Sequence, residues 1–265
     1  MRSYVDHVLA LLPFEPAAMR RLNGPPCTYV GHPLGERVAD IRPNADEAQR
    51  RLTDPPVLLV LPGSRGGEID RLAATFGKAA ATLSNRIGGL EVVVPTVARL
   101  TDKVRAAVKS WGVAARVLSD PAEKNAAFRI ARAALTKSGT ATLELALAGV
   151  PMVTGYRVPL PEAIVGRLMI GGPSIVLANL VLSENAVPEL VQGDCAPEKL
   201  AVTLLPLMSG TPERARQLEA FARLDSIMEI GRAVPSDRAA SVILDCAASF
   251  NQSRLETVAS PLPTA

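Results

Sequence analysis

The stretch that decides the fold is Val57-Leu58-Leu59-Val60-Leu61-Pro62-Gly63-Ser64-Arg65-Gly66-Gly67-Glu68. Its first five residues are valine and leucine without polar alternation, which is typical of a parallel strand buried on both faces. The glycine-rich segment 62–67 predicts a turn, and a helix is expected to begin near Glu68. One face of that helix is apolar at helical spacing, through Ile69, Leu72, Phe76, Ala79 and Leu83. A strand, a glycine turn and a helix in this order open a βαβ unit.

The alternation continues on both sides of this stretch. We expect further strands at 91–95, 115–118, 133–136 and 151–154, with helices at 102–111, 123–132 and from near residue 140 to 148. After Pro197 the pattern is helical to near residue 249, with a break at 210–212. Towards the N-terminus, short strands are expected at 8–12 and 27–30, and a polar connection with some helix at 40–51. Strands that alternate with helices indicate an α/β fold with a mainly parallel sheet and helices on both faces.

The composition excludes several classes of function. The chain has 265 residues, of which 48% are hydrophobic and 21% charged, so it can form one large domain or two modest ones. Its basic residues are scattered and only 3% of residues are aromatic, so no nucleic-acid surface is expected. Three cysteines and two histidines, all far apart, predict neither a zinc site nor a disulfide framework. A reducing cytoplasm is therefore the default expectation.

Neither a signal peptide nor a membrane-spanning helix is expected. The first residues are polar, and Pro13 and Glu15 interrupt the apolar run behind them. The most apolar longer stretch, 163–182, contains Arg167 and Pro173, which a clean spanning helix would not carry. Peripheral contact with a membrane stays compatible with this sequence.

Two segments have the features of phosphate-binding loops. Each follows a buried strand and ends in small residues before a helix, where unpaired backbone N–H groups and the helix dipole favour an anion. In the first, 61–68, Arg65 offers a planar fork of donors to phosphate oxygens. In the second, 138–144, Glu144 lies one turn into the helix and can accept hydrogen bonds from sugar hydroxyls. The alternative is that both loops are only tight connections between a strand and a helix.

Neither loop matches a common nucleotide-binding fingerprint. The lysine of the P-loop is missing after the second glycine, and the spacing G-x-G-x-x-G is absent. Ser138 is not expected to be a nucleophile, because no histidine lies near it in the sequence. The residues alone therefore predict phosphate binding without naming the ligand.

Seven short motifs occur along the chain in the same order as in one known family. They are Leu12-Pro13-Phe14-Glu15, Tyr29-Val30-Gly31-His32-Pro33-Leu34, Leu61-Pro62-Gly63-Ser64-Arg65 followed by Glu68-Ile69, Lys137-Ser138-Gly139-Thr140-Ala141-Thr142-Leu143-Glu144, Val150-Pro151-Met152-Val153, Asn179-Leu180 and Val187-Pro188-Glu189-Leu190-Val191-Gln192. In this order, over roughly residues 5–245, the chain resembles the lipid-A-disaccharide synthases, which are inverting glycosyltransferases of the GT-B architecture. That family transfers 2,3-diacylglucosamine from UDP-2,3-diacylglucosamine to 2,3-diacylglucosamine 1-phosphate (lipid X) and releases UDP, in lipid A biosynthesis of Gram-negative bacteria.

The resemblance implies a division of the chain. We expect the remnant of an N-terminal, acceptor-binding Rossmann-like domain and a linker at 1–45, and a C-terminal, UDP-sugar-binding Rossmann-like domain at 46–222. Helices that pack back towards the N-terminal domain are expected at 223–250, and a disordered tail at 251–265. The implied partners are UDP-2,3-diacylglucosamine, lipid X, UDP and the cytoplasmic face of the inner membrane, on which the family works peripherally. No cofactor and no metal are implied.

The resemblance also assigns the site. The pyrophosphate and ribose of the donor are expected against seven loop residues, namely Gly63, Ser64, Arg65, Ser138, Gly139, Thr140 and Glu144. Asn179, Glu189 and Gln192 are expected to face the cleft, with a turn residue and a helix cap as the alternatives for Asn179 and Gln192. His32 is expected to be a structural hinge residue rather than a base. An apolar group is expected either in the core or against acyl chains, and consists of Ile164, Val165, Leu168, Met169 and Ile170.

Two features depart from the family pattern. Leu177-Ala178-Asn179 stands where the family has Leu-Pro-Asn, so the asparagine is kept without the fixed φ of proline. The motif at 12–15 normally lies well inside the chain, so much of the acceptor site and the carboxylate proposed as base are expected to be missing here. The catalytic residues are accordingly unassigned, and we expect the chain alone not to catalyse transfer.

Several alternatives follow from that expectation. The chain is either the donor-binding part of the enzyme in a truncated or split form, or a non-catalytic UDP-binding or assembly module. A related UDP-sugar epimerase of the same fold would carry other acidic and histidine motifs in place of 137–144. A homodimer and a separately encoded N-terminal half are the two protein partners left open.

Overall fold

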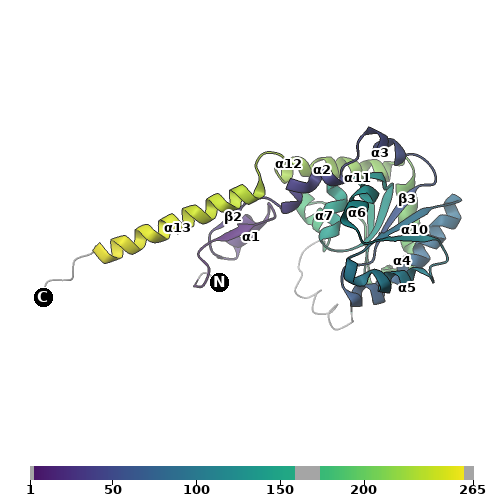
Figure 1. The fold of residues 1–265 in the computed structure, drawn as a ribbon, viewed down its shortest axis with the longest axis horizontal. Helices are drawn as coiled ribbons and strands as arrows, with labels where there is room; N and C mark the ends of the chain where they lie inside the picture. Colours follow the sequence, from purple (N-terminus) through teal and green to yellow (C-terminus); the bar gives the residue numbers. More distant parts are fainter. Residues whose placement is uncertain (1–2, 159–173, 260–265) are drawn as a thin grey trace. The chain divides into compact units, whose positions relative to one another are not determined.

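The computed structural model describes residues 3–158 and 174–259, and the chain forms two compact units (Figure 1). Unit 1 comprises the residues up to Arg37 together with those from Asp225 onward, and unit 2 comprises Val38–Leu224. The stretch 57–68 that decides the fold lies in unit 2.

Unit 2 is built on a six-stranded sheet in which every pair of neighbours is parallel. Its strands are β3 (Val57–Leu61), β4 (Glu91–Pro95), β5 (Ala115–Leu118), β6 (Ala133–Lys137), β7 (Met152–Tyr156) and β8 (Glu189–Val191). Their order is β5-β4-β3-β6-β7-β8, so β3 lies next to both β4 and β6. This is the order of the dinucleotide-binding fold, in which the direction of winding reverses between the two central strands. The predicted α/β class with a mainly parallel sheet is confirmed.

Helices cover both faces of this sheet (Figure 1). On one face, α4 (Gly66–Ile87) packs against α5 (Thr101–Val108) and α10 (Pro197–Leu204). On the other face lie α6 (Pro121–Ile130) and α7 (Thr140–Leu147). Around these two pack α2 (Val38–Ile41), α3 (Ala45–Arg50), α9 (Leu177–Leu182) and α11 (Pro212–Ala222). The short connecting elements are the 3₁₀ turns η2 (Ala98–Leu100), η3 (Gln192–Asp194) and η4 (Leu205–Met208). α12 (Leu224–Ile227) begins at the last residue of unit 2, and its other residues belong to unit 1.

Local sequence signals set the ends of the helices that border the site. α6 begins at Pro121, behind Asp120, whose carboxylate accepts hydrogen bonds from the backbone N–H groups of Ala122 and Glu123 at 2.9 and 3.0 Å. α4 ends at Ile87 and is followed by Gly88, which adopts the left-handed conformation with φ of 78°. These caps satisfy backbone groups that the helix itself leaves unpaired.

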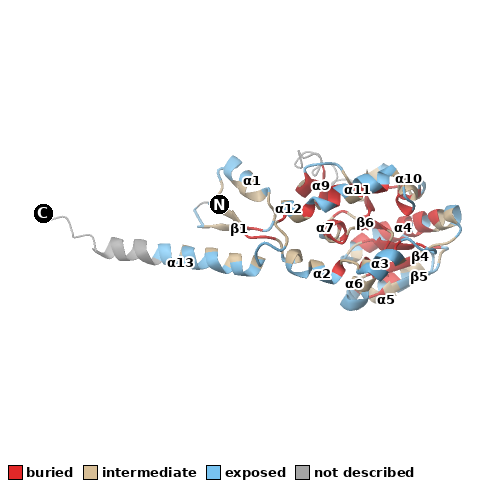
Figure 2. Cartoon of the chain, turned by 90° about the horizontal axis from the view of Figure 1, so that it is seen from above, coloured by how far each residue is buried: buried red, intermediate tan, exposed pale blue. Residues whose placement is uncertain are grey.

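The core of unit 2 lies on both sides of β3. All five residues of this strand are buried, as the sequence predicted for a central parallel strand. Phe76 of α4 is fully buried, and a Cβ on Gly155 of β7 would lie 2.7 Å from its ring, so glycine makes room for the aromatic side chain. Figure 2 shows the buried residues concentrated over the sheet and the inner sides of its helices. This buried apolar surface is the main source of stability of unit 2.

Unit 1 combines a two-stranded parallel sheet with a long helix. β1 (Val8–Ala10) pairs with β2 (Cys27–Tyr29), and α1 (Glu15–Arg21) connects the two strands. The 3₁₀ turn η1 (Pro33–Arg37) follows β2, and α13 (Pro235–Ala259) provides the C-terminal part of the unit.

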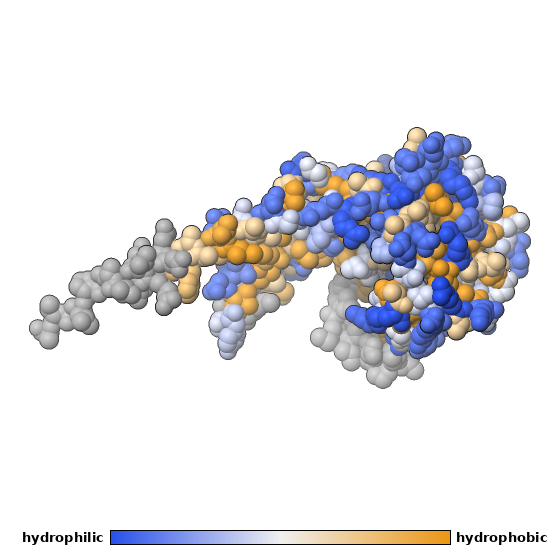
Figure 3. Space-filling view, in the orientation of Figure 1, coloured by the Kyte–Doolittle hydropathy of each residue, from blue (hydrophilic) through white to orange (hydrophobic). Residues whose placement is uncertain are grey.

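Arg238 attaches α13 to β2 within unit 1. Its guanidinium donates to the carbonyl oxygen of Tyr29 at 2.9 Å and lies 5.5 Å from the centre of the Tyr29 ring. Apolar side chains gather along the same helix (Figure 3), where Ile243, Leu244 and Phe250 are exposed. α13 is therefore held to the strands of its unit at its N-terminal end.

The last helix and the last strand of the sheet differ from the sequence-based expectation. α13 continues to Ala259 rather than ending near residue 249, because neither proline nor glycine interrupts the helix before Pro261. A disordered tail at 251–265 stays a prediction. β8 was not predicted, because a strand of three residues is too short to show a periodic pattern.

Residues 38–45 belong to unit 2 rather than to the N-terminal remnant and linker to which the sequence analysis assigned residues 1–45. Two hydrogen bonds attach them there. Arg129 of α6 donates to the carbonyl oxygen of Asp40 at 2.7 Å, and Arg42 donates to that of Leu147 at 3.1 Å. Such contacts join residues far apart in the chain, so the local sequence could not reveal them. The assignment of acceptor and donor roles to the units stays a prediction.

Candidate functional site

The two predicted loops meet where the strand order of the sheet reverses. One leaves the carboxyl end of β3 and the other that of β6, and in doubly wound sheets ligands bind in the crevice outside this point. A cavity of about 440 Å³ lies there. Its lining consists of Leu61, Gly63, Ser64, Arg65, Pro95, Thr96, Val97, Lys124, Thr136, Lys137, Gly139, Thr140, Ala141 and Glu144. The fold thus brings both loops to one site.

Glu68 organises the first loop from the inside. Its carboxylate accepts hydrogen bonds from the backbone N–H groups of Ser64 and Arg65 at 2.9 and 3.2 Å. Gly63 has φ of +137°, and a Cβ there would lie 2.4 Å from Oε2 of Glu68, so glycine is required for the loop to close over this carboxylate. Because Glu68 already takes these two N–H groups, they are not open to a phosphate in this conformation.

Lys137 joins the second loop to the same carboxylate. Its Nζ lies 2.9 Å from Oε1 of Glu68, and both side chains are largely buried. Burial by itself would raise the pKa of Glu68, but the hydrogen bonds from Lys137 and from the N–H groups of Ser64 and Arg65 hold this pKa below its ordinary value. The ion pair therefore links the loops, with Glu68 in its charged form.

The second loop offers open donors to the cavity. Gly139 has φ of +150° and precedes α7, a helix of eight residues. Within the described residues, the backbone N–H groups of Thr140 and Ala141 have no hydrogen-bond acceptor. Unpaired N–H groups at a helix N-terminus favour a negatively charged group. Thr140 and Ala141 both line the cavity, so these open N–H groups are at the place where a phosphate would bind.

Arg65 stands at the edge of the cavity with its side chain 79% exposed. Its contact with Oε1 of Glu68 is long, at 3.4 Å. Arg99 donates to the carbonyl oxygen of Ser64 at 2.6 Å and holds the loop from the side of β4. An exposed guanidinium with one weak contact can turn towards a phosphate at little cost.

An ion pair between α6 and α7 forms another part of the cavity wall. Nζ of Lys124 lies 2.8 and 3.0 Å from the two carboxylate oxygens of Glu144. The carboxylate that the sequence assigned to sugar hydroxyls is therefore in the cavity, and it is already bonded to a lysine. Sequence analysis missed Lys124, because 20 residues separate it from its partner and no local pattern joins them.

Ser138 and Asn179 do not present their side chains to this cavity. Oγ of Ser138 donates to the carbonyl oxygen of Ile175 at 2.5 Å. Asn179 is 2% exposed, and its amide exchanges hydrogen bonds with the main chain of Val187 at 2.8 and 2.9 Å. Asn179 lies within α9 rather than in a turn, and the polar atoms of its side chain are hydrogen-bonded within the fold.

Glu189 and Gln192 also serve the fold in this conformation. Glu189 accepts hydrogen bonds from Nδ2 of Asn179 at 3.0 Å and from the backbone N–H of Ile175 at 3.2 Å. The amide of Gln192 exchanges hydrogen bonds with the main chain of Val158 at 3.3 and 3.1 Å, so it does not cap a helix. These contacts tie β8 and η3 to neighbouring chain, and neither residue lines the cavity.

The other residues singled out from the sequence lie elsewhere. His32 is in unit 1, where its Nδ1 accepts a hydrogen bond from the backbone N–H of Leu34 at 3.1 Å and burial lowers its pKa. This local role agrees with a structural residue. The apolar group at 164–170 lies outside the described residues.

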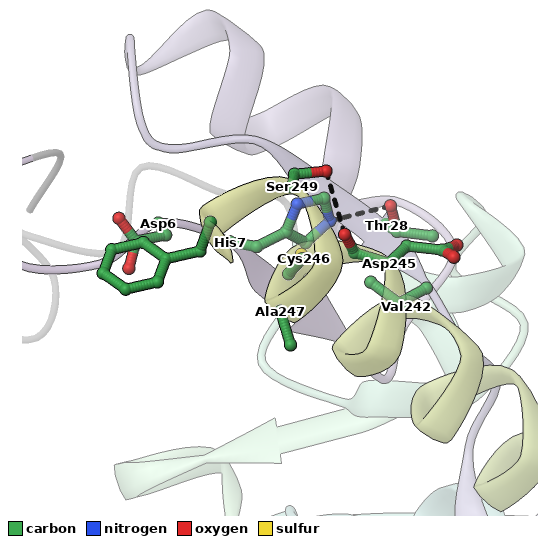
Figure 4. Close-up of a pocket in the computed structure, with 9 residues that line it drawn as sticks. Asp6, His7, Thr28, Val242, Asp245, Cys246, Ala247 and Ser249 are labelled. Carbon is green, nitrogen blue, oxygen red and sulfur yellow. Dashed lines mark hydrogen bonds between the residues drawn. The ribbon is translucent and has the colours of Figure 1, made fainter. Parts of the chain in front are cut away.

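Unit 1 contains a second cavity, of about 750 Å³ (Figure 4). Its lining consists of Asp6, His7, Thr28, Val242, Asp245, Cys246, Ala247, Ser249 and Phe250. Nε2 of His7 lies 2.9 Å from Oγ1 of Thr28. Since this lining includes two carboxylates and neither lysine nor arginine, it is unsuited to a diphosphate.

In the part of the chain that the structure describes, no group of three or more His, Cys, Asp or Glu side chains is arranged to hold a metal ion. None of its helices has both the length and the apolar character needed to cross a membrane.

Comparison with known proteins points to a single family. The family model described as lipid-A-disaccharide synthetase matches residues 1–241. Lipid-A-disaccharide synthases of Rhodopseudomonas palustris (strain HaA2) and Nitrobacter hamburgensis are 55% and 56% identical to the chain over 245 residues. These alignments cover 92% of this chain and 62% of each relative, so the chain spans less than two thirds of their length.

A solved structure shows the same fold at low identity. It is described as a UDP-N-acetylglucosamine 2-epimerase from Listeria monocytogenes, with a TM-score of 0.56 and 14% identity. The match covers 87% of this chain and 62% of that one. At this identity the likeness concerns the fold alone.

Proposed function

The chain belongs to the lipid-A-disaccharide synthase family, and on that basis we propose that unit 2 binds the UDP-sugar donor of a glycosyl transfer. The observation that carries the proposal is the cavity at the switch point of the sheet, where the N-terminus of α7 and the side chains of Arg65 and Glu144 converge. An open helix N-terminus and an arginine suit a diphosphate, and a carboxylate suits sugar hydroxyls.

Within this cavity the diphosphate binds at the start of α7. The N–H groups of Thr140 and Ala141 and the guanidinium of Arg65 supply its donors, while Glu144 accepts from the ribose. As the bond from the sugar to UDP breaks, negative charge grows on the leaving diphosphate. Fixed N–H dipoles and an arginine stabilise that charge from the protein itself.

The whole reaction proposed is the one for which the relatives are named. In it, 2,3-diacylglucosamine passes with inversion from UDP-2,3-diacylglucosamine to the 6-hydroxyl of lipid X, at the cytoplasmic surface of the inner membrane. Identities of 55% and 56% over 92% of the chain support this assignment. No base for the acceptor hydroxyl is assigned to these residues, so the chain contributes the donor side of the reaction.

The proposal predicts that the chain binds UDP when EDTA is present. Calorimetric titration should give heat, and UDP should raise the melting temperature, because the ligand stabilises the state that binds it. Uridine is the matched control and should bind more weakly, since it lacks the diphosphate. Neither heat nor a thermal shift at millimolar UDP would contradict the donor-site assignment.

Arg65→Ala tests the phosphate contact. The variant should lose about 1.5–3 kcal/mol of UDP affinity, the value of a hydrogen bond to a charged group. Its melting temperature should hardly change, because the side chain is 79% exposed. Arg105→Ala, an exposed arginine on α5, is the control and should keep UDP affinity. Unchanged UDP affinity in Arg65→Ala would show that the guanidinium does not contact the ligand.

A further inference from the structure

We propose that Lys124 is a positioning residue that holds Glu144 for the two hydroxyls of the donor's ribose, and so sets the preference for ribose over deoxyribose. The inference rests on the proposed function and deepens it. It starts from the bidentate contact in which one ammonium, Nζ of Lys124, lies 2.8 and 3.0 Å from the two oxygens of Glu144. Both side chains line the cavity.

Lys124 is itself held in place from a second side. Its Nζ lies 5.2 Å from the centre of the ring of Phe128, one turn further along α6. Phe128 is fully buried, so the ring is a rigid support. A lysine held between a buried ring and a carboxylate keeps the carboxylate in one orientation, although a free lysine side chain has many rotamers.

The hydrogen-bonding capacity of Glu144 matches a vicinal diol. An ionised carboxylate has about four lone-pair sites, and the ammonium of Lys124 occupies one on each oxygen. One site on each oxygen is left for the 2′- and 3′-hydroxyls of a ribose. Without Lys124 the same carboxylate would be free to rotate, and its acceptors would not be presented as a pair.

The positive charge of Lys124 has a second effect, on the repulsion between Glu144 and the diphosphate. Glu144 lies one turn into α7, close to the N-terminus at which the diphosphate is proposed to bind. An unpaired carboxylate there would repel the ligand. The cavity's other lysine, Lys137, is bonded to Glu68, and among the described residues Lys124 alone forms an ion pair with Glu144. Lys124 therefore reduces the repulsion between the carboxylate of Glu144 and a phosphate bound at the start of α7.

The test compares the affinities of the full chain for UDP and 2′-deoxy-UDP. For the wild type, UDP should bind about tenfold more tightly, as expected when one hydrogen bond to a charged group is lost. Lys124→Met should reduce this ratio to less than about threefold, and Glu144→Gln should reduce it similarly. Lys124→Arg should restore the ratio, because a guanidinium also pairs with both carboxylate oxygens. Lys199→Met, which breaks an exposed ion pair with Asp194 outside the cavity, should leave it unchanged.

The ratio of the affinities for UDP and 2′-deoxy-UDP distinguishes a positioning role of Lys124 from a purely structural one. A purely structural role of Lys124 would lower the melting temperature, or weaken both nucleotides alike, without changing their ratio. Arg65→Ala serves as the reference for that behaviour, since its phosphate contact is common to both nucleotides. A wild-type preference that persists in Lys124→Met overturns the inference and leaves the proposed function standing. A wild-type chain that binds neither nucleotide overturns the proposed function and this inference together.

Discussion

Replacing Arg51 with methionine is expected to lower the free energy of unfolding by about 3–5 kcal/mol, because several buried carbonyl oxygens lose a charged donor and each acceptor left without a partner costs about 1–3 kcal/mol. The residue is 8% exposed and donates to four main-chain carbonyl oxygens. They belong to Phe128, Arg129, Ala148 and Gly149, at distances of 2.9, 2.7, 2.9 and 3.0 Å. Methionine fills much of the same space but leaves all four oxygens without this donor.

The position of these oxygens connects Arg51 to the site. They lie at the C-terminal ends of α6 and α7, the two helices that carry Lys124 and Glu144. Burial, and after it the charge of Arg214, lowers the pKa of Arg51 to about 10, so the guanidinium still carries its charge at neutral pH. A cation there also interacts favourably with the negative ends of two helix dipoles.

Urea denaturation of the wild type and the variant measures this effect. Arg86→Met is the matched control, because Arg86 is exposed on α4, and it should change stability by no more than about 0.5 kcal/mol. A loss below about 1 kcal/mol in Arg51→Met would mean that water replaces the guanidinium at these carbonyl groups, and that the residue is not the link between α6 and α7.

Replacing Glu68 with glutamine is expected to destabilise the protein at neutral pH by about 1.5–3 kcal/mol and to lose that effect in acid. Glutamine keeps the shape and an acceptor oxygen but removes the charge opposite Lys137. The pKa of Glu68 in the folded protein lies below its ordinary value of 4.5. Its ionised form therefore contributes stability that is fully present above that ordinary value, and that is lost as the pH falls through the folded pKa.

The measurement is the free energy of unfolding of both proteins at neutral and at acid pH. The difference between them should shrink as the pH falls below 4.5, because the wild type then loses the same charge that the variant lacks. Asp102→Asn, at a side chain that is 99% exposed, should show a small difference at both pH values. A difference for Glu68→Gln that does not depend on pH would assign its role to the shape of the loop rather than to the ion pair.

Most strands and loops of unit 2 can be predicted from local patterns in the sequence. The strand boundaries at 57–61, 91–95 and 115–118 were predicted correctly, because an apolar run between turn residues has both the length and the pattern of a buried strand. The same reasoning placed glycine loops at the ends of β3 and β6. Since parallel strands have their carboxyl ends at one edge, and β3 and β6 are neighbours, the loops had to meet once the order was known.

The sequence by itself therefore determined the class of fold, the positions of the two loops and the family to which the chain belongs. Only the tertiary structure decided which polar groups at those loops are open. It gives the N–H groups of Ser64 and Arg65 to Glu68 and leaves those of Thr140 and Ala141 without an acceptor among the described residues. It also buries Asn179 and pairs Glu144 with Lys124. The position of each helix and strand is indicated by a pattern of neighbouring residues, so it can be predicted locally. Hydrogen bonds and ion pairs between segments depend on distances that exist only after the chain has folded.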